Sequence, residues 1–284
     1  MKKLLFLFNL LIATATMSAQ TEEENSVNAS IAQWNLGDAF TLVSDANVRE
    51  KPSTQSKALV QLPIATAIKI EQVMTDSFTV NGFRAPWCSI SYDGGKKKGY
   101  LWGGFIATVV LKMTNTYDDT EGVLFLGGVG TWDEKKSRMT MQLRAAKDGK
   151  ELSKVEFSTQ GDLGYNCTLK KETEGGLRKV SKVLTFSTGY DACGYPWGNN
   201  LIFFTKDKKL VKVLSTESVA DAGVFYSSEN YILPNDKGGI SNLVIVTSDN
   251  AEMMEKNGEY EATKQKYSIT LYKWDGAKLQ KLAK

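Results

Sequence analysis

Short runs of β-branched and aromatic residues recur along the chain, and turn residues separate them. Between Leu36 and Val110 these runs read FTLVSDANV, ALVQL, AIKIEQV, WCSISY and GYLWGGFIATVV. Apolar positions in this region do not recur at helical spacing over any useful length. Because such runs bounded by turns are typical of small barrels, the pattern predicts a barrel of about five strands over 36–110. Asp93-Gly94-Gly95 predicts a hairpin turn, since glycine accepts a positive φ.

Beyond Leu111 the pattern remains β-like. Met139–Leu143 and Ser268–Trp274 alternate strictly between apolar and polar residues, so each is expected to bury one face. Only Asn250–Lys264, rich in Glu, Lys, Met and Ala, indicates helix or loop. The segment 111–284 is therefore expected to form a larger antiparallel β domain.

A faint repeat marks this second domain. Similar segments around Asp148, Asp207 and Asp275 each follow an apolar strand, which predicts three hairpins with a turn at Asp. Recurring hairpins suggest propeller blades, but three are fewer than the roughly four to eight blades of a closed propeller. A β-sandwich explains them equally well, so the predicted class is all-β with a sandwich or propeller-like second domain.

The N-terminus has the three regions of a secretory signal. Lys2 and Lys3 precede a mostly apolar stretch that ends at Ala13, and small residues follow. The apolar stretch is shorter than the about 20 residues of a transmembrane helix, and no later segment reaches that length. We therefore predict a signal peptide over 1–19, cleaved after Ala19 or Ala15, and export to the periplasm or beyond. No cysteine lies near the cleavage region, so a lipoprotein is not expected, and the polar, acidic residues 20–35 are predicted to be a flexible linker.

Composition limits the partners. At 284 residues, with 42% hydrophobic and 24% charged residues, the chain suits a signal segment and two folded domains. Loss of Lys2 and Lys3 with the leader leaves 33 basic against 32 acidic residues, a net charge of +1. Lys96–Lys98 is the one compact basic run after the leader, which is too small a footprint for nucleic acid.

The chain contains no histidine. This excludes Ser-His-Asp and Cys-His nucleophile systems and the common zinc sites. The acidic segment Tyr117–Gly122 lacks the residue order of a calcium loop, and the glycine pairs lack the spacing of a phosphate loop. We therefore expect no metal and no cofactor, while hydrolysis by two carboxylates remains compatible with the composition.

Three cysteines in an exported chain suggest one pair and one free thiol. Cys167 and Cys193 lie in one region of the chain, whereas Cys88 shares an apolar strand face with Ile90. We expect a Cys167–Cys193 disulfide and a buried, free Cys88; the alternative is that all three are reduced and buried.

An ordered set of motifs spans the first barrel. Asn47–Ser53 reads NVREKPS, Trp87–Ile90 reads WCSI, and Gly99–Ile106 reads GYLWGGFI. In this order they resemble the bacterial SH3 family, over about 70 of 284 residues, which implies an SH3-like barrel. Ala65 replaces a glycine that the family often has, and residues 74–86 form a longer insertion than the family usually has. An insertion of this length would cover or extend a binding groove inherited from the family.

Two groups of aromatic residues are the binding-site hypotheses. In the family, rings near the strand ends form a groove for peptides or cell-wall stem peptides, which implies Tyr92, Tyr100, Trp102 and Phe105. Tyr100 and Trp102 share one face by alternation, so one of the two faces is core. The glycine-rich loop 188–200 carries Tyr190, Tyr195 and Trp197, which either present rings to a sugar or peptide or form an ordered connection.

These features favour an exported, non-catalytic binding or scaffold protein. Its expected partner is a cell-envelope polymer, such as peptidoglycan, or an envelope peptide or protein; the oligomeric state stays open. The alternatives are a carboxylate-dependent polysaccharide hydrolase, with two carboxyl groups roughly 5–10 Å apart, and an inhibitor or immunity-like protein that inserts a loop into an enzyme.

Overall fold

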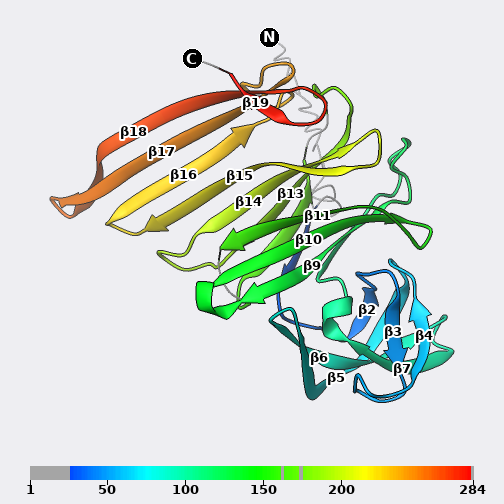
Figure 1. Cartoon of the computed structure of the whole chain (residues 1–284). Coiled ribbons are helices and arrows are strands. Elements are labelled where there is room, and N and C mark those ends of the chain that lie inside the picture. Colours follow the sequence, from blue (N-terminus) through cyan, green and yellow to red (C-terminus); the bar gives the residue numbers. More distant parts are fainter. Residues whose placement is uncertain (1–25, 161–162, 173–174, 283–284) are drawn as a thin grey trace, which may run out of the picture.

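The computed structural model describes residues 26–282 except 161–162 and 173–174, and it shows an all-β protein (Figure 1). Three antiparallel sheets of six, four and nine strands hold the described strands. Within this part of the chain, the helical elements are single 3-10 turns at Gly103–Phe105 and Glu134–Lys136. The predicted class, a small curled N-terminal sheet followed by larger antiparallel sheets, is confirmed.

The six-stranded sheet runs in the order β2-β5-β6-β7-β3-β4 and curls on itself (Figure 1). Its strands are β2 (Gly37–Phe40), β3 (Ala46–Arg49), β4 (Ala58–Leu62), β5 (Ala67–Val80), β6 (Phe83–Tyr92) and β7 (Lys97–Trp102). Alternating side chains fill its core, among them Val48, Ile70, Cys88, Ile90 and Leu101. The predicted turn at Asp93–Gly95 joins β6 to β7, and its three residues have positive φ.

The long insertion noted in the sequence is the outer half of the β5–β6 hairpin. This half reaches over to the next sheet, where the Trp132 backbone N–H donates to the Asn81 carbonyl at 3.1 Å. Gly82 follows with a φ of 78°, and a Cβ there would lie 1.9 Å from the Trp132 carbonyl oxygen. Only glycine allows this approach, so the insertion anchors the barrel to the rest of the molecule.

The remaining sheets pack face to face (Figure 1). The four-stranded sheet has the order β11-β10-β9-β8, and the nine-stranded sheet runs β1-β12-β13-β14-β15-β16-β17-β18-β19. Edge-to-face pairs join them: Phe125 meets Phe204 at 5.1 Å, and Phe157 meets Phe186 at 5.3 Å between ring centroids. This is a β-sandwich with one core between two sheets, so the propeller-like alternative is wrong.

The strands of these two sheets include the hairpins that were predicted from the sequence. The four-stranded sheet consists of β8 (Val109–Lys112), β9 (Leu124–Asp133), β10 (Arg138–Lys147) and β11 (Lys150–Gln160). The nine-stranded sheet consists of β1 (Ser26–Ser30), β12 (Asn166–Lys171), β13 (Val180–Gly189), β14 (Trp197–Thr205), β15 (Leu210–Asp221), β16 (Phe225–Ile232), β17 (Leu243–Lys256), β18 (Glu259–Trp274) and β19 (Leu279–Lys281). The three hairpins predicted at Asp148, Asp207 and Asp275 are confirmed as β10–β11, β14–β15 and β18–β19.

The barrel and the sandwich share a core. The predicted boundary at 110/111 falls inside β8, which pairs with β9. One cluster of buried residues includes Trp87 and Trp102 from the barrel together with Leu111 and Phe125 from the sandwich. The two parts therefore support each other directly.

Ser26–Ser30 form β1, where the sequence predicted a flexible linker. This edge strand pairs with β12 along its whole length, and Ile31 directly after it is buried. Val27 and Ala29 alternate with its polar residues and pack against the sandwich core, and backbone hydrogen bonds attach the strand to the sheet. The predicted signal peptide and cleavage sites at residues 1–19 lie outside the described residues.

The expectation of helix or loop at Asn250–Lys264 is wrong. These residues form the outer part of the β17–β18 hairpin, whose turn is Asn257-Gly258 with φ of 57° and 82°. Asn-Gly is the turn pair that favours a two-residue hairpin, and this signal outweighs the local helix propensity. In Figure 1 the outer ends of β16, β17 and β18 extend beyond the four-stranded sheet.

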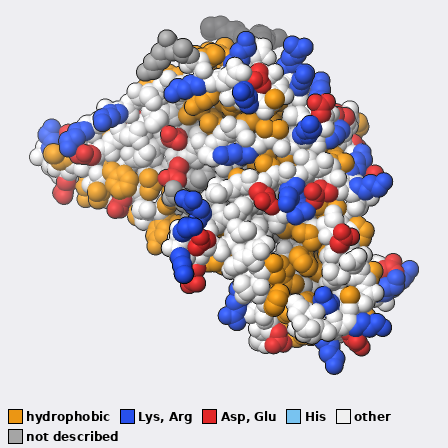
Figure 2. All heavy atoms as spheres, in the orientation of Figure 1, with side chains coloured by type: hydrophobic (Ala, Val, Ile, Leu, Met, Phe, Trp, Pro, Cys, Tyr) orange, Lys and Arg blue, Asp and Glu red, His pale blue; other side chains and the backbone are white. Residues whose placement is uncertain are grey.

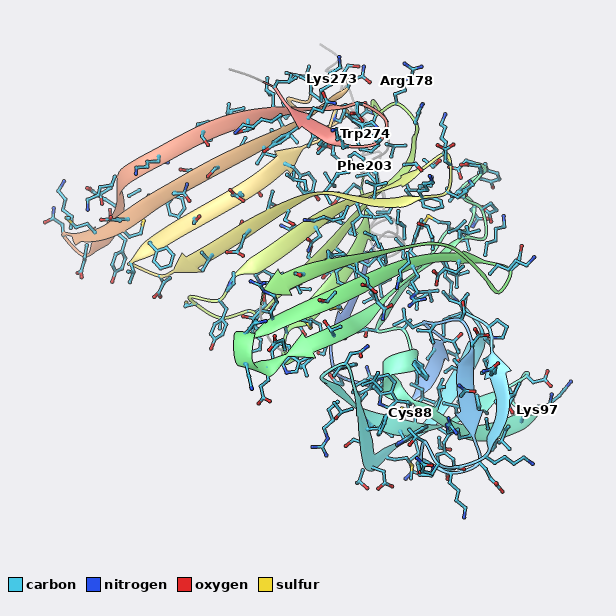
Figure 3. The ribbon with its side chains drawn as sticks, in the orientation of Figure 1. Cys88, Lys97, Arg178, Phe203, Lys273 and Trp274 are labelled. Carbon is cyan, nitrogen blue, oxygen red and sulfur yellow. The ribbon has the colours of Figure 1, made fainter. Side chains whose placement is uncertain are left out.

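A second core lies on the face of the nine-stranded sheet opposite to the sandwich core. Phe203 meets Trp274 edge to face at 5.0 Å, and the Trp274 Nε1–H donates to the Arg178 carbonyl at 2.9 Å (Figure 3). Trp274 fits the buried face predicted for Ser268–Trp274, but Ile269 is 49% exposed. Ile269 and Trp274 are an odd number of positions apart, so Ile269 lies on the opposite face of β18 from Trp274 and Tyr272, which pack in this core.

One lysine is buried against the sandwich. Lys182 in β13 is 2% exposed, and its Nζ donates to Asp118 Oδ2 at 2.7 Å. Burial acts to raise the pKa of Asp118, but Lys182 and hydrogen bonds from Thr120 outweigh it and hold that pKa well below 3.8. The pair fixes the β8–β9 loop to the nine-stranded sheet.

The surface is mixed in charge. Figure 2 shows basic and acidic side chains interspersed over the visible face, with apolar patches between them. Among the described residues, no helix is long and apolar enough to cross a membrane.

Candidate ligand-binding grooves

The β13–β14 loop carries the second group of predicted binding residues. Tyr190 and Tyr195 are 45% and 49% exposed, and Trp197 at the start of β14 is half-buried. All three line one groove of about 580 Å³, together with Asp191, Ala192, Cys193, Ser218, Val219, Ala220, Tyr226, Ser227 and Ser228. We call this set the aromatic groove.

The exposed tyrosine rings of the aromatic groove pack against a buried ring. Tyr190 and Tyr195 lie 5.5 Å apart between centroids, and they lie 6.0 and 6.3 Å from the buried Tyr165. Aromatic pairs at such distances contribute roughly 0.5–1.5 kcal/mol beyond their burial. Because Tyr165 belongs to the sandwich core, the exposed rings are ordered before any ligand arrives.

The backbone of the loop is tied to β15. Gly194 has a φ of 77°, and its N–H donates to the Ala220 carbonyl at 2.8 Å. Trp197 pairs directly with Ser218, and its ring lies so close to Gly189 that a Cβ there would approach it to 2.3 Å. The loop is therefore fixed to the central strands of the nine-stranded sheet.

Strands β15 and β16 supply polar groups that the sequence analysis missed. Ser218 and Ser228 bring their hydroxyl oxygens to 3.5 Å, and the Tyr226 hydroxyl accepts from Gln265 Nε2 at 3.1 Å. Burial, and then the nearby Asp249 carboxylate, raise the pKa of Tyr226, so its hydroxyl stays protonated at neutral pH. No spacing in the sequence links these residues to the loop, because sheet pairing alone brings them there.

The groups that line the groove bear on the chemistry that it can support. Among the described residues that line it, Asp191 alone carries a carboxyl group. Glycoside hydrolysis by the two-carboxylate route needs a second carboxyl group across the bond. The described part of the chain also holds no cluster of three potential metal ligands among His, Cys, Asp and Glu.

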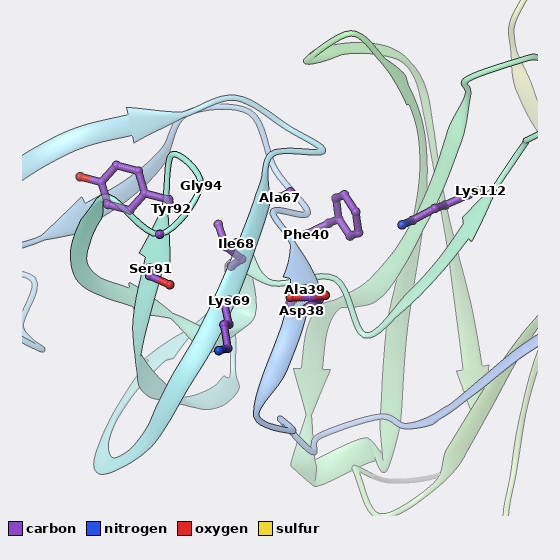
Figure 4. Close-up of a pocket in the computed structure, with 11 residues that line it drawn as sticks. Asp38, Ala39, Phe40, Ala67, Ile68, Lys69, Ser91, Tyr92, Gly94 and Lys112 are labelled. Carbon is purple, nitrogen blue, oxygen red and sulfur yellow. The ribbon is translucent and has the colours of Figure 1, made fainter.

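A second groove of about 460 Å³ lies beside the barrel (Figure 4). It is lined by Asp38, Ala39, Phe40, Ala67, Ile68, Lys69, Ser91, Tyr92, Gly94, Gly95 and Lys112. Lys112 reaches from β8 to the Phe40 ring, with Nζ 4.7 Å from the centroid. This barrel groove includes one of the predicted rings, Tyr92.

The four predicted barrel rings do not form one exposed surface. Tyr92 and Trp102 are buried, and Tyr100 and Phe105 are half-buried. Trp102 belongs to the shared core, where its Nε1–H donates to the carbonyls of Phe78 and Ala85 at 2.9 and 3.1 Å. Both faces of β7 are covered, because Leu101 fills the barrel core while Trp102 faces the sandwich.

The expected Cys167–Cys193 disulfide is wrong. In the described part of the chain all three cysteines are free: Cys88 and Cys167 are buried and Cys193 is exposed. Cys167 points into the sandwich core from β12, whereas Cys193 lies in the loop that borders the aromatic groove. Burial raises the pKa of both buried thiols to about 12. The predicted burial of a free Cys88 is confirmed.

Comparison with protein-family models, with characterised proteins and with solved structures finds no match for this chain.

Proposed function

We propose that this is an exported, non-catalytic binding protein that recognises a cell-envelope component through the aromatic groove. The observation that carries the proposal is that Tyr190, Tyr195 and Trp197 gather around one groove with hydroxyl groups from β15 and β16. Exposed, pre-ordered rings with adjacent polar groups are what binding sites use to combine contact area with orientation.

The barrel takes a supporting role in this proposal. The motifs of 36–110 resemble bacterial SH3 domains, and we infer a barrel of that type. Its main aromatic side chains are used in its own core and in the core shared with the sandwich. The barrel groove at Tyr92 is the second place where an envelope peptide would bind.

The two rival functions receive less support from the same site. A hydrolase needs a pair of carboxyl groups, and among the described residues that line the aromatic groove only Asp191 carries one. An inhibitor would project loop 188–200 toward its target. Instead the loop folds back, with Tyr190 and Tyr195 against Tyr165 and with Gly194 bonded to Ala220.

A paired capture experiment tests the proposal. The mature protein is incubated with purified peptidoglycan and, separately, with an envelope lysate, which distinguishes a polymer from a protein partner. Tyr195→Ala should weaken capture by about tenfold or more, because exposed anchor rings carry a large share of binding energy. Tyr117→Ala is the matched control, since Tyr117 is 93% exposed and lies outside the aromatic groove. Equal capture of wild type and Tyr195→Ala would refute the site.

A further inference from the structure

The aromatic groove continues across the sheet. Trp197 pairs with Ser218, Ser218 with Ser228, Ser228 with Asp249, and Asp249 with Tyr267, in direct register across β14 to β18. Direct partners in antiparallel strands project to the same side of a sheet. These five residues, which we call the cross-strand row, therefore form one line from the groove to the projecting hairpin.

The length of this line is set by strand spacing. Neighbouring strands lie roughly 4.8 Å apart, so the four steps from Trp197 to Tyr267 span about 19 Å. Tyr267 at the far end is 62% exposed. A ligand that touches both terminal rings is longer than a single sugar ring or a single amino acid.

The polar groups between the rings form a connected set. Gln265 Nε2 donates to Asp249 Oδ1 at 2.9 Å and to the Tyr226 hydroxyl at 3.1 Å. An ionised carboxylate can accept about four hydrogen bonds, so Asp249 retains capacity for hydroxyl donors of a ligand. Ser218 and Ser228 add hydroxyl groups that can both donate and accept.

The charge of the row limits the ligand class. Among the described residues of the aromatic groove and the cross-strand row there is no lysine or arginine, and the carboxylates are Asp191 and Asp249. A phosphate- or carboxylate-rich polymer would meet no cation there. Hydroxyl groups suit the row better, because they bond to carboxylate, amide and hydroxyl groups alike.

We propose that the cross-strand row binds a linear, uncharged polysaccharide chain, which lies across the strands with its sugar faces on Trp197 and Tyr267 and its hydroxyl groups on Asp249. This rests on the proposed function and deepens it by naming the ligand class. The rings supply flat apolar contact for the C–H faces of sugars, and the serine, carboxylate and amide groups between them bond the equatorial hydroxyls.

Calorimetric titration of the mature full-length protein tests the proposal. The ligands are oligomers of glucose, of mannose and of N-acetylglucosamine, each as a disaccharide and as a hexasaccharide. At least one series should bind, with the hexasaccharide tighter than the disaccharide. Tyr267→Ala should weaken the hexasaccharide by about tenfold and leave the disaccharide unchanged, because the short ligand does not span both rings. Asp249→Asn, one strand away from Tyr267, should likewise weaken the hexasaccharide, and Tyr117→Ala should weaken neither ligand.

Binding of none of the three series, or equal effects of Tyr267→Ala on short and long ligands, would overturn the proposal. So would capture of peptidoglycan stem peptides or of an envelope protein by the same row. These outcomes are distinct from failure of the proposed function. If Tyr195→Ala still abolishes capture on whole envelope material, the groove remains the binding site and only the ligand class is refuted.

Discussion

Replacement of Trp102 by alanine tests whether this ring is structural. Trp102 is 5% exposed and lies where barrel and sandwich meet, edge to face with Phe105 at 5.1 Å. Removing a buried tryptophan costs about 3–5 kcal/mol, which corresponds to a fall in Tm of roughly 6–20 °C for a protein of this size. The assay is thermal and urea unfolding of the mature chain, followed by near-UV circular dichroism.

Trp102→Phe separates packing from hydrogen bonding. It keeps a ring in the core but removes the Nε1–H that donates to Phe78 and Ala85. Buried carbonyls left without a donor cost about 1–3 kcal/mol, so this variant should lie between wild type and Trp102→Ala. Unchanged unfolding of Trp102→Ala together with weakened envelope capture would refute the reasoning, because the ring would then belong to a binding surface.

Three further results are expected. Mass spectrometry of the exported product should find its N-terminus after Ala19 or Ala15, upstream of β1; retention of Met1 would contradict export. Alkylation of the native protein should modify Cys193 alone, with the two buried thiols reacting only after unfolding; modification of none would indicate a disulfide. Asp118→Asn should lower the free energy of unfolding at pH 7. Because the folded pKa of Asp118 is depressed, its contribution is present above about 3.8 and lost as the pH falls further, so wild type and Asp118→Asn should converge at low pH; a constant difference would refute this.

Local patterns predicted the elements of this fold well. The turn at Asp93–Gly95 and the three Asp hairpins follow from residue preferences that act within a few positions. Asn257-Gly258 carries the same kind of turn signal, but the surrounding Glu, Lys and Met residues favour helix, and the expectation for 250–264 followed that composition. β1 was missed because its apolar residues, Val27 and Ala29, are only two and small, a pattern too short to distinguish an edge strand from a polar linker.

The proposed binding site was only half predictable from the sequence. Aromatic residues close together in the chain, as in loop 188–200, can be recognised from sequence, whereas Tyr226, Asp249 and Tyr267 reach the site only through sheet register. Alternation placed Tyr100 and Trp102 on one face of β7 but could not show that a second sheet covers that face. The disulfide prediction failed for a similar reason, since closeness in sequence does not fix the direction of a side chain.

Protection of Cys193 tests the central claim most directly, because it needs no substitution. Cys193 is exposed and lines the aromatic groove. Its alkylation rate is measured in the wild-type mature protein with and without solubilised envelope material, and the denatured protein provides the total thiol count. If an envelope component binds in the groove, alkylation of Cys193 should slow by about the fraction of protein bound. An unchanged rate in samples where binding is complete would contradict the account, because the ligand would then lie elsewhere.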